Sequence, residues 1–524
     1  MKKRNYLKGL RVTLAILFFV PILLFFIDFS ALLPDSVHRL LHVQLMPAVL
    51  GGMIGIVVVQ LVLALLFGRI YCSAICPAGV LQDLINRLFC IGKKKRKGSR
   101  RFVYHKPANG LRYGILGITA LLALLGFSEL CLLLDPYSNF GRIAASLFRP
   151  VVMEVNNLLA DLLMKVDNYT LYHVTISTVT TAGLVAAVIA LLLFIGMTVW
   201  RGRLFCNTLC PVGALLSLVS RYSFFRVTFD PTSCTHCGSC EHTCKSEAID
   251  SRTLKVDTSR CVDCFNCLSS CPKGGLQYRL QLPGKPAEIK PETPHDTNSR
   301  RAFLAAGATV AASLPAVSAL AQRRRRQRGK GHKHAEEVAN WAPLTPPGSI
   351  SLERFKDKCT GCQICVVRCP SQVLRPAGLE YGLDFMLKPR LAYVNSYCNY
   401  ECRVCSEVCP TGAIKPLTVE EKTTTQVGIA TFFKNLCVVH TENQDCGACS
   451  EHCPTQAVRM VPYKGTLTIP EVNPDLCIGC GGCESICPVR PTRAIMVKPN
   501  EVHQFVEKPK EEEVKEIVVD DFGF

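Results

Sequence analysis

Several signatures of common redox and nucleotide-dependent proteins are missing from this chain of 524 residues. The sequence has no C-x-x-C-H motif for attachment of haem c, no G-x-G-x-x-G motif after a predicted strand and no glycine-rich phosphate loop. We therefore expect no c-type haem, no nicotinamide cofactor and no nucleotide hydrolysis.

Charged residues are almost absent from four stretches, each long enough to cross a hydrocarbon core about 30 Å thick. These stretches are residues 12–29, 45–67, 113–134 and 174–200. Basic residues are numerous before the first stretch and between the second and third, but scarce between the third and fourth. Because basic loops favour the cytoplasmic side, the pattern predicts a four-helix transmembrane bundle with both ends in the cytoplasm. Much of the net charge of +19 lies beside these stretches, so we expect membrane lipid and no nucleic acid as a partner.

The second and fourth stretches each run into the same short motif, which indicates a duplicated helical hairpin. Residues 68–77 and 202–211 share a C-x3-C-P element with cysteines at Cys72, Cys76, Cys206 and Cys210. Cysteines four apart on a helical turn face the same way, so the two pairs could converge. Three interpretations stay open: an additional iron-sulfur cluster, two dithiol/disulfide switches, or simple packing. Cys90 and Cys131 stand alone and are expected to be structural.

Most of the 30 cysteines fall in tight, repeated runs, which favour metal ligation over disulfides. The first two runs have the spacing of bacterial two-cluster ferredoxins, in which the fourth cysteine of each run binds the other cluster. Zinc sites use paired C-x2-C units more often than runs of four. The predicted ligand sets are Cys234, Cys237, Cys240 and Cys271 for one 4Fe-4S cluster, and Cys261, Cys264, Cys267 and Cys244 for the other.

The carboxyl-terminal half contains four further runs, two with standard spacing and two inner runs with a longer gap or an insertion. Because the standard runs flank the variant ones, we predict a nested exchange of fourth ligands. The expected sets are Cys359, Cys362, Cys365 with Cys487; Cys477, Cys480, Cys483 with Cys369; Cys398, Cys402, Cys405 with Cys453; and Cys437, Cys446, Cys449 with Cys409. The chain would then carry six 4Fe-4S clusters, with the C-x3-C-P pairs as a candidate seventh.

The two halves are joined by a segment with the features of a Tat export signal. Ser299 to Leu304 contain a twin arginine, a mildly apolar run follows, and residues 319–321 offer an A-x-A cleavage site. An alanine-rich linker helix is the alternative, supported by the basic run at residues 323–333, which opposes the positive-inside rule.

The expected architecture is multi-domain, with a four-helix transmembrane bundle and α+β bacterial ferredoxin-like modules. The predicted domains are a membrane domain at 1–225, a two-cluster module at 226–290, the twin-arginine-like segment and basic linker at 291–350, a four-cluster module at 351–500 and an acidic tail at 501–524.

These motifs carry a resemblance to two known families joined end to end. Residues 1–280, with the C-x3-C-P elements and the two-cluster module, resemble the NapH-type membrane subunit of quinol dehydrogenases. Residues from 299 onward resemble the NapG-type exported ferredoxin. The resemblance implies a quinol dehydrogenase component that oxidises ubiquinol or menaquinol from the quinone pool. Electrons would reach a periplasmic reductase, such as nitrate reductase, or a cytochrome c-type acceptor. The protein would lie in the bacterial inner membrane, with the first module in the cytoplasm and the second in the periplasm.

No quinol site is readable in the sequence, and other functions remain open. His38, His42, Glu129 and Asp135 lie near the predicted outer edge, and their side chains could accept protons from a quinol. One alternative is a membrane redox sensor or maturation factor that switches the C-x3-C-P thiols. Another is a relay that takes electrons from a cytoplasmic donor through the first module. Steady turnover with quinol as the donor separates these alternatives.

Overall fold

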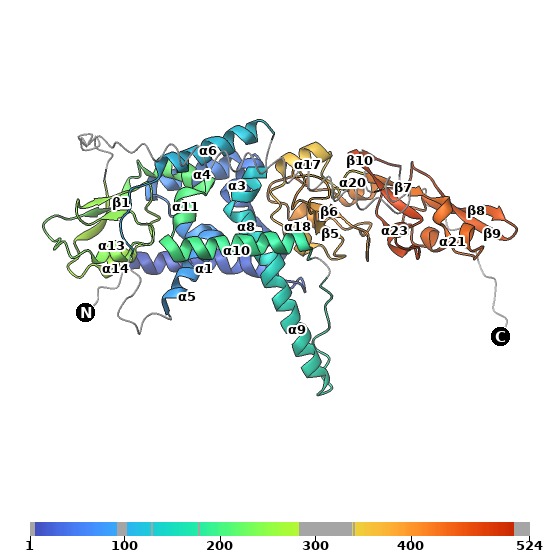
Figure 1. Ribbon diagram of the computed structural model, residues 1–524, viewed down its shortest axis with the longest axis horizontal. Helices are drawn as coiled ribbons and strands as arrows, with labels where there is room; N and C mark the ends of the chain where they lie inside the picture. Colours follow the sequence, from blue (N-terminus) through green and yellow to red (C-terminus); the bar gives the residue numbers. More distant parts are fainter. Residues whose placement is uncertain are drawn as a thin grey trace, which may run out of the picture.

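The computed structural model describes residues 6–91, 102–126, 129–176, 179–281, 338 and 341–507. The molecule is elongated, with one cysteine-rich module at each end and a helical unit between them (Figure 1). We call residues 225–281 the first cysteine module and residues 341–507 the second cysteine module. The basic residues 93–97, the twin-arginine-like segment, the A-x-A site, the basic run at 323–333 and most of the acidic tail lie outside the described residues.

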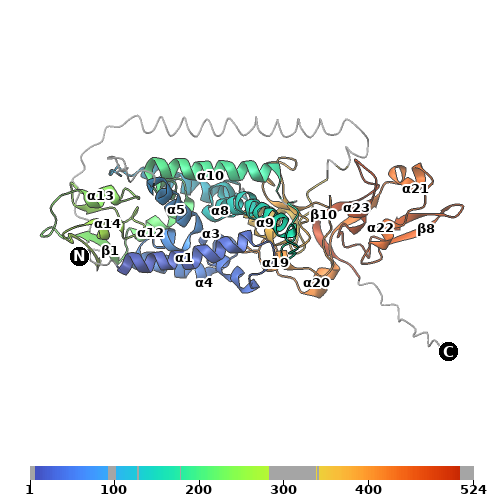
Figure 2. The ribbon, with the colours of Figure 1, turned by 90° about the horizontal axis from the view of Figure 1, so that it is seen from below.

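Two long apolar helices run along the long axis of the helical unit (Figures 1 and 2). They are α1 (Tyr6–Ile27) and α10 (Thr181–Arg201). The side chain of Thr180 caps α10 by accepting a hydrogen bond from the Gly183 N–H at 3.2 Å, and the helix ends at Gly202, whose φ of +65° favours glycine. Among the described residues, these two helices are long and apolar enough to cross a membrane.

The other two predicted spans are interrupted. The second consists of α3 (Leu45–Leu50) and α4 (Ile54–Phe67), separated at Gly52 with a φ of +70°. The third consists of α6 (Asn109–Leu124) and α7 (Glu129–Leu134). The predicted bundle of four continuous spans is therefore not confirmed. Hydropathy did not reveal either break, because the residues that flank the breaks are apolar.

Short helices complete the helical unit. The helix α8 is buried along its whole length, and Asp135 caps it by accepting hydrogen bonds from the Ser138 N–H at 2.8 Å and the Ser138 hydroxyl at 2.6 Å. The helix α9 projects sideways from the unit (Figure 1). The remaining short elements are η1 (Asp35–His38), α2 (Arg39–His42), η2 (Tyr71–Ile75), α5 (Pro77–Ile91), α8 (Pro136–Ile143), η3 (Ala144–Phe148), α9 (Arg149–Met164), α11 (Leu204–Thr208) and α12 (Pro211–Ser220).

The first cysteine module is built from two antiparallel strand pairs and two short helices. Strands β1 and β4 pair with Val227 opposite Tyr278, and β2 pairs with β3. Val227, Ile249 and Leu276 form a small core with the buried cysteines. The bounds are β1 (Phe225–Phe229), α13 (Ser239–Thr243), β2 (Ile249–Asp250), β3 (Lys255–Val256), α14 (Asn266–Ser270) and β4 (Leu276–Leu280).

The second cysteine module contains three antiparallel strand pairs: β5 with β6, β7 with β10, and β8 with β9. Short helices carry most of the cysteine runs between these strands. The bounds are α17 (Leu352–Lys358), α18 (Ile364–Arg368), β5 (Leu374–Pro376), β6 (Pro389–Leu391), α19 (Val404–Glu407), α20 (Val419–Thr424), β7 (Thr425–Phe432), η4 (Lys434–Leu436), α21 (Val438–Thr441), α22 (Ala448–Glu451), β8 (Val458–Lys464), β9 (Leu467–Val472), α23 (Gly482–Ile486) and β10 (Ile495–Phe505).

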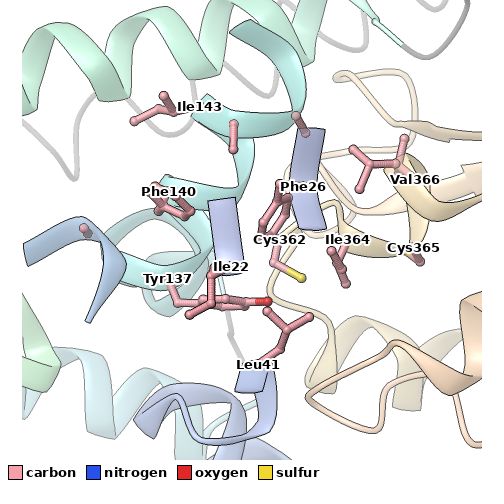
Figure 3. Close-up of a cluster of buried hydrophobic side chains, with 14 of the residues drawn as sticks. Ile22, Phe26, Leu41, Tyr137, Phe140, Ile143, Cys362, Ile364, Cys365 and Val366 are labelled. Carbon is pink, nitrogen blue, oxygen red and sulfur yellow. The ribbon is translucent and has the colours of Figure 1, made fainter. Parts of the chain in front are cut away.

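The helical unit shares one hydrophobic core with the second cysteine module. Phe26 of α1 and Tyr137 of α8 lie beside Cys362 in that core (Figure 3). The Arg368 guanidinium pairs with Asp28 at 3.0 Å, and both side chains are nearly inaccessible. Buried aromatic and aliphatic side chains each contribute about 1.5–3 kcal/mol to such a contact, so the second module is fixed to this end of the helices.

Candidate redox centres

The four cysteine runs of standard spacing share a backbone feature that presents their thiols. The residue after the second cysteine has a positive φ in each: Gly238 at +68°, Phe265 at +57°, Gln363 at +65° and Gly481 at +80°. That residue opens the short helix that carries the third cysteine, so the chain turns sharply around a common centre. The two variant runs lack it, since Arg403 and Gly447 have φ values of −126° and −114°.

The first cysteine module gathers its eight cysteines into two sets of four. Cys234, Cys237 and Cys240 line one small cavity together with Cys271. The second cavity is lined by the other set, Cys244, Cys261, Cys264 and Cys267. The fourth cysteine of each run therefore joins the other run, as the spacing predicts.

The nested exchange predicted for the second cysteine module is wrong. Cys487 lines a cavity with Cys437, Cys446 and Cys449, and not with the first run. Cys453 lines another with Cys477, Cys480 and Cys483. Neighbouring runs along the chain therefore exchange their fourth cysteines.

The same exchange holds between the first two runs of this module. The thiols of Cys359, Cys362 and Cys365 interact electrostatically with that of Cys409. Cys398 and Cys405 interact in the same way with Cys402 and Cys369. The observed sets are thus Cys359, Cys362, Cys365 with Cys409, and Cys398, Cys402, Cys405 with Cys369.

Antiparallel hairpins explain why neighbouring runs exchange. The β2–β3 pair lies between the runs of the first module, β5–β6 between the first two runs of the second module, and β8–β9 between its last two. Each hairpin turns the chain back, which brings the fourth cysteine of one run beside the first three of the next. The connection between the two inner runs is α20 and β7 instead, and β7 pairs with the distant β10.

The chemistry of these thiol sets fits iron-sulfur clusters. Burial raises the pKa of Cys244 to about 11, and the neighbouring Cys264 thiol adds to the effect. Four such thiols become thiolates together only against a cationic metal core. Backbone N–H groups also point at sulfur, from Gly275 to Cys271 Sγ at 3.2 Å and from Ala248 to Cys244 Sγ at 3.4 Å.

A single metal ion fits the thiol sets less well than a cluster does. Among the described residues, no group of three or more His, Cys, Asp or Glu side chains converges as ligands of one ion do. In a 4Fe-4S cubane each thiolate binds a different iron, so the four sulfur atoms stand farther apart than around one zinc ion.

The four cysteines of the C-x3-C-P elements also come together. Cys72 lies on η2, Cys206 lies on α11, and Cys76 and Cys210 immediately precede α5 and α12. All four are free, buried thiols that interact electrostatically with one another. The Cys210 sulfur accepts a hydrogen bond from the Gly213 N–H at 3.3 Å, at the amino terminus of α12. We call this group the four-thiol centre.

Two buried arginines bracket the four-thiol centre with near two-fold symmetry. Arg69 Nη2 lies 3.8 Å from Cys72 Sγ and donates to the Cys206 carbonyl oxygen at 2.9 Å. Arg203 Nη1 lies 4.0 Å from Cys206 Sγ and donates to the Cys72 carbonyl oxygen at 2.8 Å. Each arginine thus links its own repeat to the other. Sequence reasoning missed this pair, although both arginines stand three residues before the first cysteine of their repeat.

The first cysteine module docks beside the four-thiol centre through buried charges. Asp83 of α5 pairs with Lys245 at 2.7 Å, with Arg203 Nε at 2.9 Å, and with Arg11. The three cations lower the Asp83 pKa well below its usual range, against the opposing effect of burial, which is the largest single contribution. Arg69 Nη1 also donates to the Ser259 carbonyl oxygen at 3.1 Å. These contacts hold the module against the C-x3-C-P elements.

Two buried tyrosines lie between the four-thiol centre and the second cysteine module. Tyr71 interacts electrostatically with Cys72 and Cys76, and Tyr137 interacts with Cys362 and Cys409. Both tyrosines also lie in electrostatic range of Asp135. One tyrosine therefore lies near each group of thiols, and Asp135 lies near both tyrosines.

The structure does not gather the four predicted quinol residues into one site. The His38 and His42 rings lie 5.8 Å apart on η1 and α2. Asp135 is occupied as the cap of α8, and Glu129 lies at the start of α7.

Cys131 is buried, with its thiol 3.7 Å from the Thr119 carbonyl oxygen, which fits a packing role. The side chain of Cys90 lies outside the described residues.

Three parts of the chain match known iron-sulfur families. Residues 46–98 and 183–229, which contain the C-x3-C-P elements, match a family described as a 4Fe-4S binding domain. Residues 226–272 match a family described as a 4Fe-4S dicluster domain. A second family with that description matches residues 358–429 and 444–490, which cover the two neighbouring pairs of runs except Cys437. No solved structure matches the chain significantly.

Curated relatives match parts of the chain. The putative electron transport protein YccM of Escherichia coli is 29% identical over 249 residues, which cover 45% of this chain and 58% of that protein. The methylamine utilization ferredoxin-type protein MauM of Methylobacillus flagellatus is 30% identical over 173 residues, or 30% of this chain and 69% of MauM. The ferredoxin-type protein NapH of Haemophilus influenzae is 26% identical over 240 residues, or 44% of this chain and 69% of NapH. The chain therefore belongs to the ferredoxin-type proteins, as a multi-domain iron-sulfur electron-transport protein with several 4Fe-4S domains.

Proposed function

We propose that this protein is the membrane-bound component of a quinol dehydrogenase, passing electrons from the quinol pool to a periplasmic reductase such as nitrate reductase. The observation that carries the proposal is the placement of the thiol sets. They occupy both ends of the elongated molecule, and the four-thiol centre lies in the helical unit between the two modules (Figure 1). A relay needs such a series, because electrons move between centres only over short gaps. The likeness to NapH supports the assignment.

The ligands in this proposal are the 24 cysteines of the six sets. Each set would hold one 4Fe-4S cluster, which accepts and releases one electron at a time when bound. The four-thiol centre would hold a seventh, supported by the family match across both C-x3-C-P elements. Arg69 and Arg203 place positive charge beside Cys72 and Cys206, which offsets part of the cost of forming buried thiolates.

The proposed localisation is the bacterial inner membrane, crossed by α1 and α10 along the long axis. The basic residues near the amino terminus and in the 93–112 loop then place the first cysteine module in the cytoplasm. The second module, at the opposite end, faces the periplasm. The twin-arginine-like segment between the modules would direct the export of the second module. We propose the same domain bounds as those predicted from the sequence. Cleavage at residue 321 is not proposed.

Reduction by a quinol is the experiment that tests this function. We expect the anaerobically purified full chain, mixed with a menaquinol analogue, to develop the EPR signals of reduced 4Fe-4S clusters. We also expect it to reduce an artificial acceptor continuously, because a relay returns to its starting state after each electron. A single response without turnover would instead support a redox sensor.

A cytoplasmic electron donor is the second candidate. Cys237 is exposed at the surface of the first cysteine module, so the centre at this end of the molecule is accessible to a soluble protein. In the same assay, reduction by a low-potential ferredoxin together with inertness toward quinol would favour this candidate over quinol oxidation.

A further inference from the structure

A long groove of about 1240 Å³ lies between the helical unit and the second cysteine module. One wall is α10, the other includes residues 378–390 of the module, and α7 and α8 close one side. None of the four quinol residues suggested by the sequence lines it. Small-molecule sites are usually mostly apolar with a few polar side chains, as this groove is.

The apolar part of the groove has the length and position for an isoprenoid chain. Its α10 wall extends from Ala182 to Phe194, which spans about 18 Å at the helical rise. The small side chains of Ala182, Ala186 and Ala190 leave room for a ligand along this wall. Val185 and Ile189 are more than half exposed at its rim, so among the described residues the groove opens sideways, toward lipid in the proposed orientation.

One end of the groove is polar. Arg390 Nε lies 3.4 Å from Glu380 Oε1, and both side chains are about one-third exposed, at 27% and 33%. Asn139 and Arg142 line the same groove from α8, with Arg142 Nη1 donating to Asn139 Oδ1 at 3.3 Å. Asn139 already donates its amide N–H groups to the carbonyl oxygens of Leu133 and Asp135. The donor that this end offers to a ligand is therefore the Arg390 guanidinium, whose Nε has no hydrogen-bond partner among the described residues, beside the Glu380 carboxylate with access to water.

Arg142 connects the groove directly to a thiol set. It donates to the carbonyl oxygens of Thr360 and Gly361, each at 3.3 Å, between Cys359 and Cys362. A ligand bound against Arg142 is thus separated from that set by one side chain and one loop. A structural lipid would fit the apolar wall, but it has no need of this proximity.

We propose that this groove is the quinol site, with the isoprenoid tail along α10 and the ring beside Glu380 and Arg390, against Arg142. This inference rests on the proposed quinol dehydrogenase function. The quinol loses two electrons and two protons and becomes the quinone. Cys359, Cys362, Cys365 and Cys409 would hold the cluster that accepts the electrons singly and passes them toward the acceptor, while the protons would leave through the Glu380 carboxylate to water.

Photolabelling of the full chain in lipid nanodiscs tests the site without relying on turnover. An azido-quinone with an isoprenoid tail is expected to label peptides from 182–194 and 378–390. Ala186→Phe fills the groove and should reduce both labelling and quinol-driven cluster reduction by about tenfold or more. The matched control is Val188→Phe, which lies on the same helix outside the groove, is partly exposed, and should change neither.

Three outcomes separate this inference from the proposed function. Loss of labelling in Ala186→Phe, with dithionite reduction of the clusters intact, supports the groove as the quinol site. Quinol-driven reduction that persists in Ala186→Phe, with labelling elsewhere, overturns the groove and leaves quinol oxidation standing. Groove labelling that persists in the presence of excess unlabelled quinone would show that the groove does not select quinone and would overturn the inference.

Discussion

Replacing Cys72 and Cys206 together by serine is expected to remove one whole cluster, four of about 28 iron atoms per chain. These two residues supply half of the four-thiol centre, one from each repeat, and both are buried beside an arginine. The two remaining thiolates leave two of the four irons of a cubane without a cysteine ligand, so we expect the cluster to be lost.

The same variant should also disconnect the two cysteine modules. The four-thiol centre lies between them, so an electron donor that reduces one module should no longer reduce the other within the time of turnover. Iron and sulfide analysis measures the first effect, and EPR after brief mixing measures the second. Cys131→Ser is the control, since this lone buried thiol lies outside every set and should leave the iron content unchanged.

Unchanged iron in the double variant would contradict a seventh cluster. The thiols would then be a dithiol/disulfide switch or packing residues. Alkylation of the wild type before and after reduction distinguishes these, because only a switch changes its number of reactive thiols.

Cys487→Ser is expected to free the thiols of Cys437, Cys446 and Cys449 for alkylation, while all other cysteines stay protected. Cys487 shares its cavity with those three residues, so its loss opens one coordination position on their cluster. Loss of a thiolate ligand leaves an iron bound to solvent and the cluster open to oxidation, and the freed thiols then react. Peptide mass spectrometry after mild air exposure and alkylation reads the pattern directly.

Cys369→Ser is the matched variant in the other half of the module. This variant should free the thiols of Cys398, Cys402 and Cys405 for alkylation, because Cys369 is the fourth cysteine of their set. If Cys487→Ser instead exposed Cys359, Cys362 and Cys365, the nested exchange would be right and the observed grouping wrong.

The sequence predicted the local elements of the site better than its long-range pairing. The runs of standard spacing identified the first three thiols of each set. The turns at Gly238, Phe265, Gln363 and Gly481, which let three thiols within seven residues face one centre, were seen only in the structure. Which run donates the fourth thiol depends on the hairpins between runs. Strands β5 and β6 have three residues each, and the β8–β9 pair has a register shift between Pro462 and Lys464, so no clear hairpin pattern is visible in the sequence.

The helical unit and the groove show a second limit. Hydropathy located α1 and α10 but not the break at Gly52, since a helix and a broken helix have the same composition. The residues of the groove come from α8 and from the 378–390 segment, more than 200 positions apart in the chain. No spacing in the sequence relates Arg142 to Glu380, whereas the repeat of Arg69 and Arg203 was visible in it.

The most direct test of the account is the iron, acid-labile sulfide and zinc content of the anaerobically purified full chain, read together with its EPR spectrum after reduction. Seven clusters predict about 28 iron and as much sulfide per chain, no stoichiometric zinc, and signals of interacting reduced 4Fe-4S centres. Zinc in place of iron, or iron without matching sulfide, would contradict an iron-sulfur relay.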